Sequence, residues 1–162
     1  MLLYLVRHAY AGQHGDPRYP DDELRPLTRK GCKRFRRVIK RLSRRGFEPT
    51  IVATSPLVRC RQTAEVICQR ISPPPELFEL ESLKPGSNFE AIVAWSQPHA
   101  AEELAWVGHS PDLDSMACAL LGAREGSILL AKGAVAAIAF DGPPAAGQGQ
   151  LRWCVTPKTL GG

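Results

Sequence analysis

The chain has 162 residues, of which 44% are hydrophobic and 23% are charged, the balance of an ordinary globular protein. We expect one domain over 1–162, and its opening apolar run, 2–6, is too short for a signal peptide or a membrane span. We therefore expect a cytoplasmic protein with no membrane partner. Five cysteines without a C-x-x-C pair favour reduced, mostly buried thiols over a disulfide framework or a zinc knuckle.

The net charge of +5 comes from one segment of the chain. Between Arg29 and Arg45 there are ten lysines or arginines and no acidic residue, whereas the rest of the chain holds 11 basic and 16 acidic residues. The segment lacks the interleaved aromatic residues of a nucleic-acid surface, so we expect no nucleic-acid partner. Two interpretations stay open: a solvated helix face, or a surface that attracts an anionic partner or substrate.

The first predicted element is a buried strand, Leu2–Val6, which is continuously apolar and includes a β-branched and an aromatic residue. Arg7 and His8 follow it directly. Ligands bind at the carboxyl ends of strands in open α/β sheets, so these two side chains are expected at the mouth of a crevice. The polar segment 10–26 has no regular pattern, which predicts a functional loop that forms one wall of that crevice.

The basic segment is predicted to be a helix with Thr28 as its N-cap and Gly46 at its end. Its opposite face is apolar at spacings of three and four residues: Cys32, Phe35, Ile39 and Leu42.

A second strand, 50–54, leads into a helix predicted to begin at Ser55-Pro56 and to end near Ile71. Arg59 would lie in the first turn of this helix, where the helix N-terminus favours a bound anion. Arg61 would lie on a different face.

Further elements follow in the order expected of alternating strands and helices. They are an extended segment at 76–83, a helix at 88–97, a strand at 103–108, a helix at 113–121, and strands at 134–140 and 150–155. The last two strands surround a Gly/Pro-rich loop and predict an antiparallel edge. The whole predicts an α/β fold, a three-layer α/β/α sandwich with a mostly parallel central sheet.

Three strand–turn–helix units place Arg7-His8, Arg59 and His109 at equivalent positions. In right-handed crossovers these strand ends lie at one edge of the sheet, so two arginines and two histidines would converge. Such a group can hold phosphate, because arginine donates paired hydrogen bonds and the turn amides after His109, at Ser110, add donors. The sequence therefore predicts an anion pocket with a potential nucleophile.

These residues resemble the motifs of the histidine phosphatase superfamily. Arg7-His8-Ala9 is similar to its Arg-His-Gly signature, and the other similar segments follow in the family's order: Arg25-Pro26-Leu27-Thr28 with Gly31-Cys32, Ser55-Pro56 with Arg59 and Gln62-Thr63, and Gly108-His109. The short chain looks like the small phosphohistidine phosphatase, or SixA-like, branch. The resemblance covers residues 2 to about 120 and implies a phosphoglycerate mutase-like fold.

The resemblance implies a role for each member of the pocket. His8 would be the nucleophile that is transiently phosphorylated, while Arg7, Arg59 and His109 would bind the phosphoryl group and stabilise its charge. The nucleophile must be neutral, and two neighbouring guanidinium groups disfavour its protonation. Water would then release the phosphate, with no metal and no cofactor.

Two positions depart from the family's pattern. Ala9 stands where glycine is usual, which removes no catalytic atom. Larger members use a carboxylic acid as proton donor; here Glu81 is the first candidate by position, ahead of Glu79. A phosphorylated imidazole is already a good leaving group and needs this acid less.

The sequence leaves more than one function open. The first is removal of phosphate from phosphohistidine on a protein. The others are a phosphatase for a small monoester, such as a sugar phosphate or a nucleotide, and a non-catalytic phosphate-binding module. The partner would be a phosphorylated protein or a small phosphorylated substrate, and we expect a monomer.

Overall fold

The computed structural model describes residues 1–100 and 102–161. Within them a six-stranded sheet has the order β3-β2-β4-β1-β5-β6. The first four strands in this order are mutually parallel, and β5 pairs antiparallel with both β1 and β6. The strands are β1 (Leu2–Arg7), β2 (Ile51–Thr54), β3 (Glu76–Glu79), β4 (Leu104–Gly108), β5 (Val135–Ala139) and β6 (Gln150–Val155).

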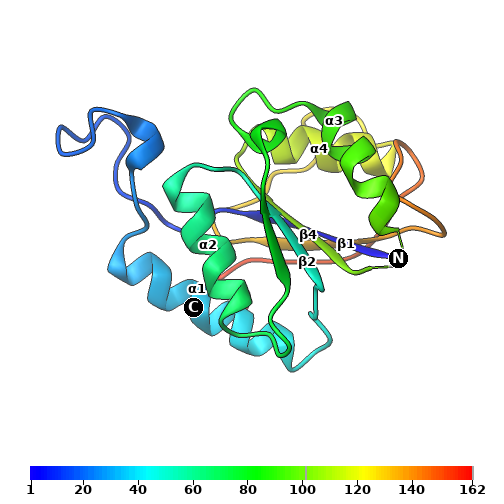
Figure 1. Ribbon diagram of the computed structural model, residues 1–162, viewed down its shortest axis with the longest axis horizontal. Helices are drawn as coiled ribbons and strands as arrows, with labels where there is room; N and C mark the ends of the chain where they lie inside the picture. Colours follow the sequence, from blue (N-terminus) through cyan, green and yellow to red (C-terminus); the bar gives the residue numbers. More distant parts are fainter. Residues whose placement is uncertain (101, 162) are drawn as a thin grey trace.

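Helices cover both faces of this sheet (Figure 1): α1 and α2 lie on one face, and α3 and α4 on the other. Their bounds are α1 (Arg29–Ser43), α2 (Val58–Cys68), α3 (Phe89–Ser96) and α4 (Asp112–Leu121). Short 3-10 helices are η1 (Asp22–Leu24), η2 (Glu81–Leu83) and η3 (Gln97–His99). The predicted α/β/α sandwich with an antiparallel edge is therefore confirmed.

The alternation of side chains along β1 divides the core into two clusters. Tyr4 and Val6 pack with residues of α1 and α2, whereas Leu3 and Leu5 pack with residues of α3 and α4. All four side chains are fully buried. Because β1 is central and apolar on both faces, its carboxyl end, with Arg7 and His8, is held rigidly by the two layers.

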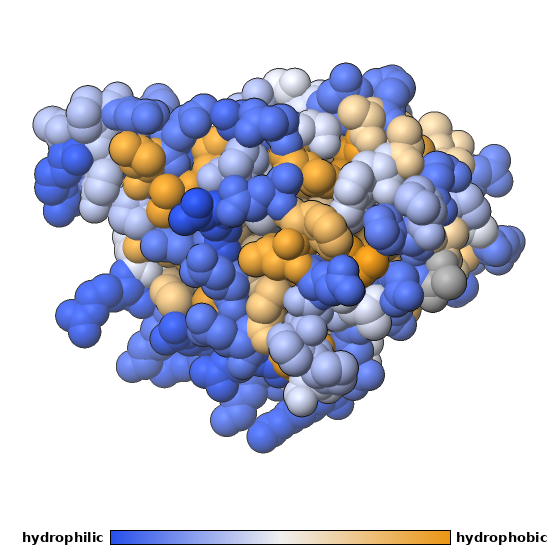
Figure 2. All heavy atoms as spheres, in the orientation of Figure 1, coloured by the Kyte–Doolittle hydropathy of each residue, from blue (hydrophilic) through white to orange (hydrophobic). Residues whose placement is uncertain are grey.

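Helix α1 has one buried stripe and one charged face, as predicted. Thr28 caps it, since its hydroxyl accepts a hydrogen bond of 2.9 Å from the backbone N–H of Gly31. Just beyond the helix, Gly46 adopts a left-handed conformation with φ of 84°. The surface over α1 is hydrophilic (Figure 2).

The predicted start of the second helix was wrong by two residues. Helix α2 begins at Val58, and Leu57, not Ser55, occupies its N-cap position. The hydroxyl of Ser55 is instead fully buried and lies 2.9 Å from Nε2 of His109. The helix also ends at Cys68, three residues before the predicted Ile71.

All five cysteines are free. Cys60 and Cys118 are buried, two more are half-buried, and Cys154 is exposed, so the prediction of mostly buried thiols holds only in part. In the described part of the chain, no helix is both long and apolar enough to cross a bilayer.

Gly31 allows α1 to pack closely against the segment that follows β1. A Cβ atom at this position would overlap the carbonyl oxygen of Tyr10 and would lie 2.9 Å from the hydroxyl of Thr28. The same carbonyl accepts a hydrogen bond of 3.0 Å from the backbone N–H of Thr28. Only glycine therefore permits this contact two residues after His8.

We expect Gly31→Ala to destabilise the protein by about 1–3 kcal/mol, although alanine normally favours a helix, because its methyl group would push against backbone. Urea unfolding should show a lower midpoint with an unchanged slope. Gly142→Ala is the matched control, since a Cβ there meets nothing within 4 Å, and its effect should stay within about 0.5 kcal/mol. Equal stability of the two variants would contradict the packing argument.

Candidate active site

A pocket of about 760 Å³ lies at the carboxyl ends of β1 and β4, where α2 begins. The predicted group converges here, because Arg7, His8, Arg59 and His109 all line this pocket. The loop 10–26 forms one wall, as predicted. Its lining residues there are Ala11, Gly12, Gln13, His14, Asp22 and Arg25.

The ring of His8 uses one nitrogen for a hydrogen bond to the backbone and keeps a lone pair on the other. Its Nδ1 lies 2.8 Å from the carbonyl oxygen of Ala9, which can only accept, so Nδ1 carries the proton and Nε2 keeps its lone pair. Burial is the main cause that lowers the pKa of His8 to about 4, and the charges of Arg59 and Arg7 act in the same direction. The ring is therefore neutral at physiological pH and able to act as a nucleophile through Nε2.

His109 faces His8 across the pocket. The two ring centroids are 5.3 Å apart, so one tetrahedral anion could contact both rings. His109 Nε2 lies 2.9 Å from the Ser55 hydroxyl and 3.4 Å from the Cys60 sulfur. Burial, followed by the charge of Arg59, lowers the pKa of His109 to about 3. The Ser55 hydroxyl, from the segment after β2, orients the ring of His109, which follows β4.

Arg7 and Arg59 bring permanent positive charge into a buried place. Arg7 Nη1 donates to the carbonyl oxygen of Leu130 at 2.6 Å, and Arg59 Nη1 donates to that of Asp22 at 2.8 Å. Each guanidinium also has a buried Nε–H without a partner among the described residues. Unpaired buried donors are costly, and an oxyanion would satisfy them.

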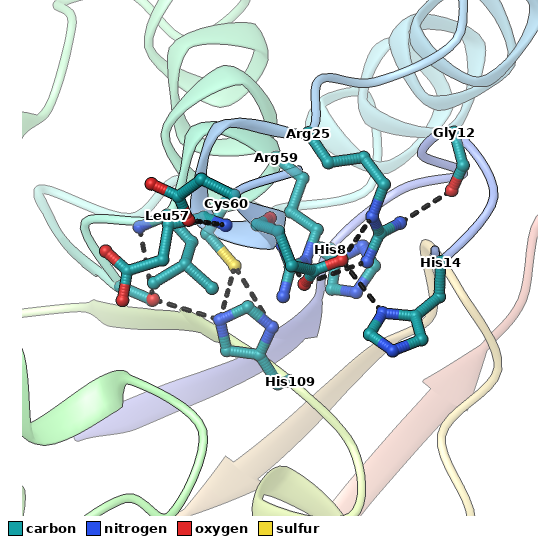
Figure 3. Close-up of polar contacts among 12 residues, drawn as sticks. His8, Gly12, His14, Arg25, Leu57, Arg59, Cys60 and His109 are labelled. Carbon is teal, nitrogen blue, oxygen red and sulfur yellow. Dashed lines mark hydrogen bonds and ion pairs between the residues drawn. The ribbon is translucent and has the colours of Figure 1, made fainter. Parts of the chain in front are cut away.

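Asp22 connects the loop wall to the arginines, and Figure 3 shows Arg25 and His14 of that wall lying close to Arg59 and His8. Its carboxylate accepts a 2.7 Å hydrogen bond from Arg25 Nε and lies 3.2 Å from Arg59 Nη1 and 2.9 Å from His14 Nδ1. The hydrogen bond from Arg25 is the main cause that holds the pKa of Asp22 far below its usual range. Asp22 therefore stays ionised and positions the arginines.

Lys132 is a pocket residue that sequence reasoning missed. The next residue, Gly133, donates its backbone N–H to the carbonyl oxygens of both Arg7 and His8, at 3.2 and 3.1 Å. A signal was present: an antiparallel strand beside β1 must begin where β1 ends, so the residues before 134–140 had to lie beside His8.

The predicted proton donors lie outside the pocket. The Glu81 carboxylate is 78% exposed and pairs with Lys84 at 3.1 Å, and Glu79 pairs with Arg61 at 3.7 Å. Neither glutamate lines the pocket. The chain leaves the sheet after Glu79 and turns into η2, which directs Glu81 toward solvent.

Ser110 and Ala9 complete the set of predicted positions. Ser110 lines the pocket, but its hydroxyl donates to Asp114 at 3.0 Å. Ala9 is buried, and its backbone N–H donates to the Thr63 hydroxyl at 3.1 Å, so its methyl group fits where glycine is usual. Within residues 1–100 and 102–161, no three His, Cys, Asp or Glu side chains are grouped so as to hold a metal ion.

The site holds two neutral imidazoles among fixed positive charges, at the strand ends of an α/β/α sandwich. This arrangement is typical of a phosphatase that works through a histidine. Comparison with known proteins agrees with this class. The model of the histidine phosphatase superfamily (branch 1) matches residues 3–84, about half of the chain, and the chain belongs to this superfamily.

Relatives support the same assignment. The chain is 38% identical over 130 residues to an uncharacterised protein of Picosynechococcus sp., with 78% of this chain and 76% of that protein covered. It is 27% identical over 163 residues to the phosphohistidine phosphatase SixA of Escherichia coli, with coverage of 99% and 96%.

Solved structures share the fold. The protein histidine phosphatase SixA complexed with tungstate superposes with a TM-score of 0.85 at 23% identity, with 99% of both chains covered. The alpha-ribazole phosphatase of Shigella flexneri superposes with a TM-score of 0.71 at 15% identity, covering 91% of this chain and 96% of that one.

Proposed function

We propose that this protein removes the phosphoryl group from phosphohistidine on a protein. His8 Nε2 attacks phosphorus as the bond to the substrate's imidazole nitrogen breaks, so the phosphoryl group passes to His8. Water then attacks phosphorus, the bond to His8 breaks, and inorganic phosphate leaves. Arg7, Arg59 and His109 stabilise the charge on the transferring oxygens in both steps.

The observation that carries this proposal is that, among the described residues, both carboxylates at the pocket are engaged as hydrogen-bond acceptors. An alkoxide leaving group needs a proton, and the carboxylic acid that supplies it must stay protonated near neutral pH. Glu81 and Glu79 lie outside the pocket. Of the two carboxylates that line it, Asp22 has a pKa held far below its usual range, and Asp112 accepts a 3.1 Å hydrogen bond from the backbone N–H of Gly86. An imidazole protonated on its other nitrogen leaves as a neutral ring and requires no such acid.

The similarity to SixA of Escherichia coli over nearly the whole chain supports the same substrate. The fold is also that of phosphatases named for small molecules, such as alpha-ribazole phosphatase. A small monoester is therefore the competing substrate class.

We expect kcat/KM for a phosphohistidine-bearing protein to exceed that for a sugar phosphate or a nucleotide by about 10²-fold or more, because general acid catalysis contributes that much where it is present. Phosphate release at pH 7 measures both. A sugar phosphate or nucleotide hydrolysed as fast as phosphohistidine would overturn the proposal in favour of a small-molecule phosphatase.

A series of aryl phosphates gives an independent measurement. Without an acid, the rate should fall steeply as the pKa of the leaving phenol rises. A shallow dependence would mean that a group in the pocket protonates the leaving oxygen, contrary to the proposal.

A further inference from the structure

The charged face of α1 is mostly exposed. Lys30, Lys33, Arg36, Arg37 and Lys40 are all exposed, and none forms an ion pair with an acidic side chain that the structure describes. We call these five residues the basic face. A solvated helix face of ordinary composition mixes both signs of charge and pairs them three or four residues apart, which this one does not.

The positive charges of the basic face also destabilise α1, the helix that carries them. Lys33 and Arg37 are one turn apart, as are Arg36 and Lys40, so like charges repel along the helix. The first turn holds Arg29 and Lys30 and no acidic residue, next to the positive end of the helix dipole. Charges arranged against local stability in this way are typical of a surface that attracts an anionic partner.

A groove of about 820 Å³ follows the basic face from Arg29 to Lys40 and reaches Arg70 just beyond α2. Apart from Cys32, the residues that line it are all lysines or arginines. Its length along α1 is about 16 Å, at about 1.5 Å per helical residue. This is larger than one phosphate and suits an extended run of acidic side chains.

The basic face is continuous with the pocket. Lys132, in the pocket lining, has its Nζ 5.8 Å from the ring centroid of Tyr10, and the Arg34 guanidinium carbon lies 5.5 Å from the same centroid. Lys30 and Arg34 of α1 line a small surface depression together with Tyr10. Positive charge therefore runs without interruption from the pocket, across Tyr10, to α1.

We propose that the basic face docks an acidic surface of the phosphoprotein substrate while its phosphohistidine enters the pocket. This inference rests on the proposed function and extends it to substrate choice. Docking would raise the local concentration of the phosphohistidine and speed encounter at low salt. An acidic protein fits better than a single-stranded nucleic acid, because the cation–ring contacts described beside these charges involve Tyr10 alone, and unpaired bases need stacking platforms.

Two synthetic phosphohistidine peptides test this. One carries six glutamates on each side of the phosphohistidine and the other six glutamines; six extended residues span about 20 Å, enough to follow the groove. In Lys33→Glu/Arg37→Glu, kcat/KM for the glutamate peptide should fall at least about tenfold at low salt, and about 0.5 M salt should abolish the difference. The glutamine peptide should change less than about twofold.

Arg124→Glu/Arg152→Glu is the matched control. It makes the same change in net charge at two exposed positions outside the pocket and outside the groove, and it should leave the glutamate peptide within about twofold. An equal loss in the control, or an equal loss with both peptides in the α1 variant, would overturn docking on the basic face.

A binding measurement distinguishes a failure of this inference from a failure of the proposed function. Fluorescence anisotropy of the unphosphorylated glutamate peptide should show binding to the wild type that the α1 reversal removes, even if phosphohistidine proves not to be the substrate. A 20-base-pair DNA duplex bound more tightly than this peptide at 150 mM salt would overturn the acidic-protein partner in favour of a nucleic acid.

Discussion

Replacement of His8 by alanine is expected to abolish turnover, with a loss of about 10⁴-fold or more, because it removes the atom that accepts the phosphoryl group. The side chain lost is neutral and makes one hydrogen bond, to the carbonyl oxygen of Ala9. The fold should therefore remain, as circular dichroism and thermal unfolding would show. Activity above a few percent of wild type would refute the nucleophilic role.

Formation of the proposed phosphoryl intermediate on His8 can be measured directly. Rapid acid-free quenching of wild type with ³²P-labelled substrate should trap an acid-labile phosphate on the protein, and His8→Ala should show none. His99→Ala is the control, since it removes an imidazole in η3, outside the pocket, and should keep the label. Label in His8→Ala would place the acceptor elsewhere, and a wild type that never acquires it would indicate a phosphate-binding module.

The convergence of Arg7, His8, Arg59 and His109 could be predicted from the sequence, because this convergence depends on topology. Each residue follows a buried strand, and parallel strands present their carboxyl ends at one edge. Continuous apolar runs are sufficient to find such strands, and the order of strands and helices restricts their arrangement. Nothing about individual side-chain conformations was needed.

Glu81 could not be placed by the same reasoning. The alternating pattern over 76–83 predicts an extended segment but not the residue at which the chain leaves the sheet. Strand β3 ends at Glu79 and η2 begins at Glu81, which reverses the direction of that side chain. Strand β3 ends where its ladder with β2 ends, at the pair of Thr54 and Glu79, and beyond that point Glu81 pairs locally with Lys84, three residues further on.

Asp22 and Ser55 are two further residues whose contacts could not be predicted from the sequence. Asp22 lies in a loop with no periodicity, and its place beside Arg59 depends on hydrogen bonds that fold the loop inward. Ser55 has the sequence of a helix cap, yet its hydroxyl lies against His109, 54 residues away in the chain. The same hydroxyl also accepts a 3.4 Å hydrogen bond from the backbone N–H of Leu57, so it makes a local contact and a tertiary contact together.

Arg59→Ala is expected to lower kcat/KM by about 10²-fold or more, because Arg59 supplies a buried positive charge to the transferring phosphoryl group. It should also move the acid limb of kcat/KM to higher pH, since the charge of Arg59 helps to lower the pKa of His8 and its loss raises that pKa toward the ordinary value. Arg59→Lys keeps the charge and should restore part of the rate, although it loses the planar pair of donors.

Arg61→Ala is the natural control for this prediction. Arg61 lies two residues further along α2, is 45% exposed, and meets only Glu79 at 3.7 Å among its ion-pair partners in the described chain. Its loss should change kcat/KM by less than about threefold and leave the pH profile in place, because exposed ion pairs contribute little. Equal effects of the two substitutions, or an Arg59→Ala enzyme within threefold of wild type, would remove Arg59 from the phosphate-binding group and with it the geometric basis of the proposed reaction.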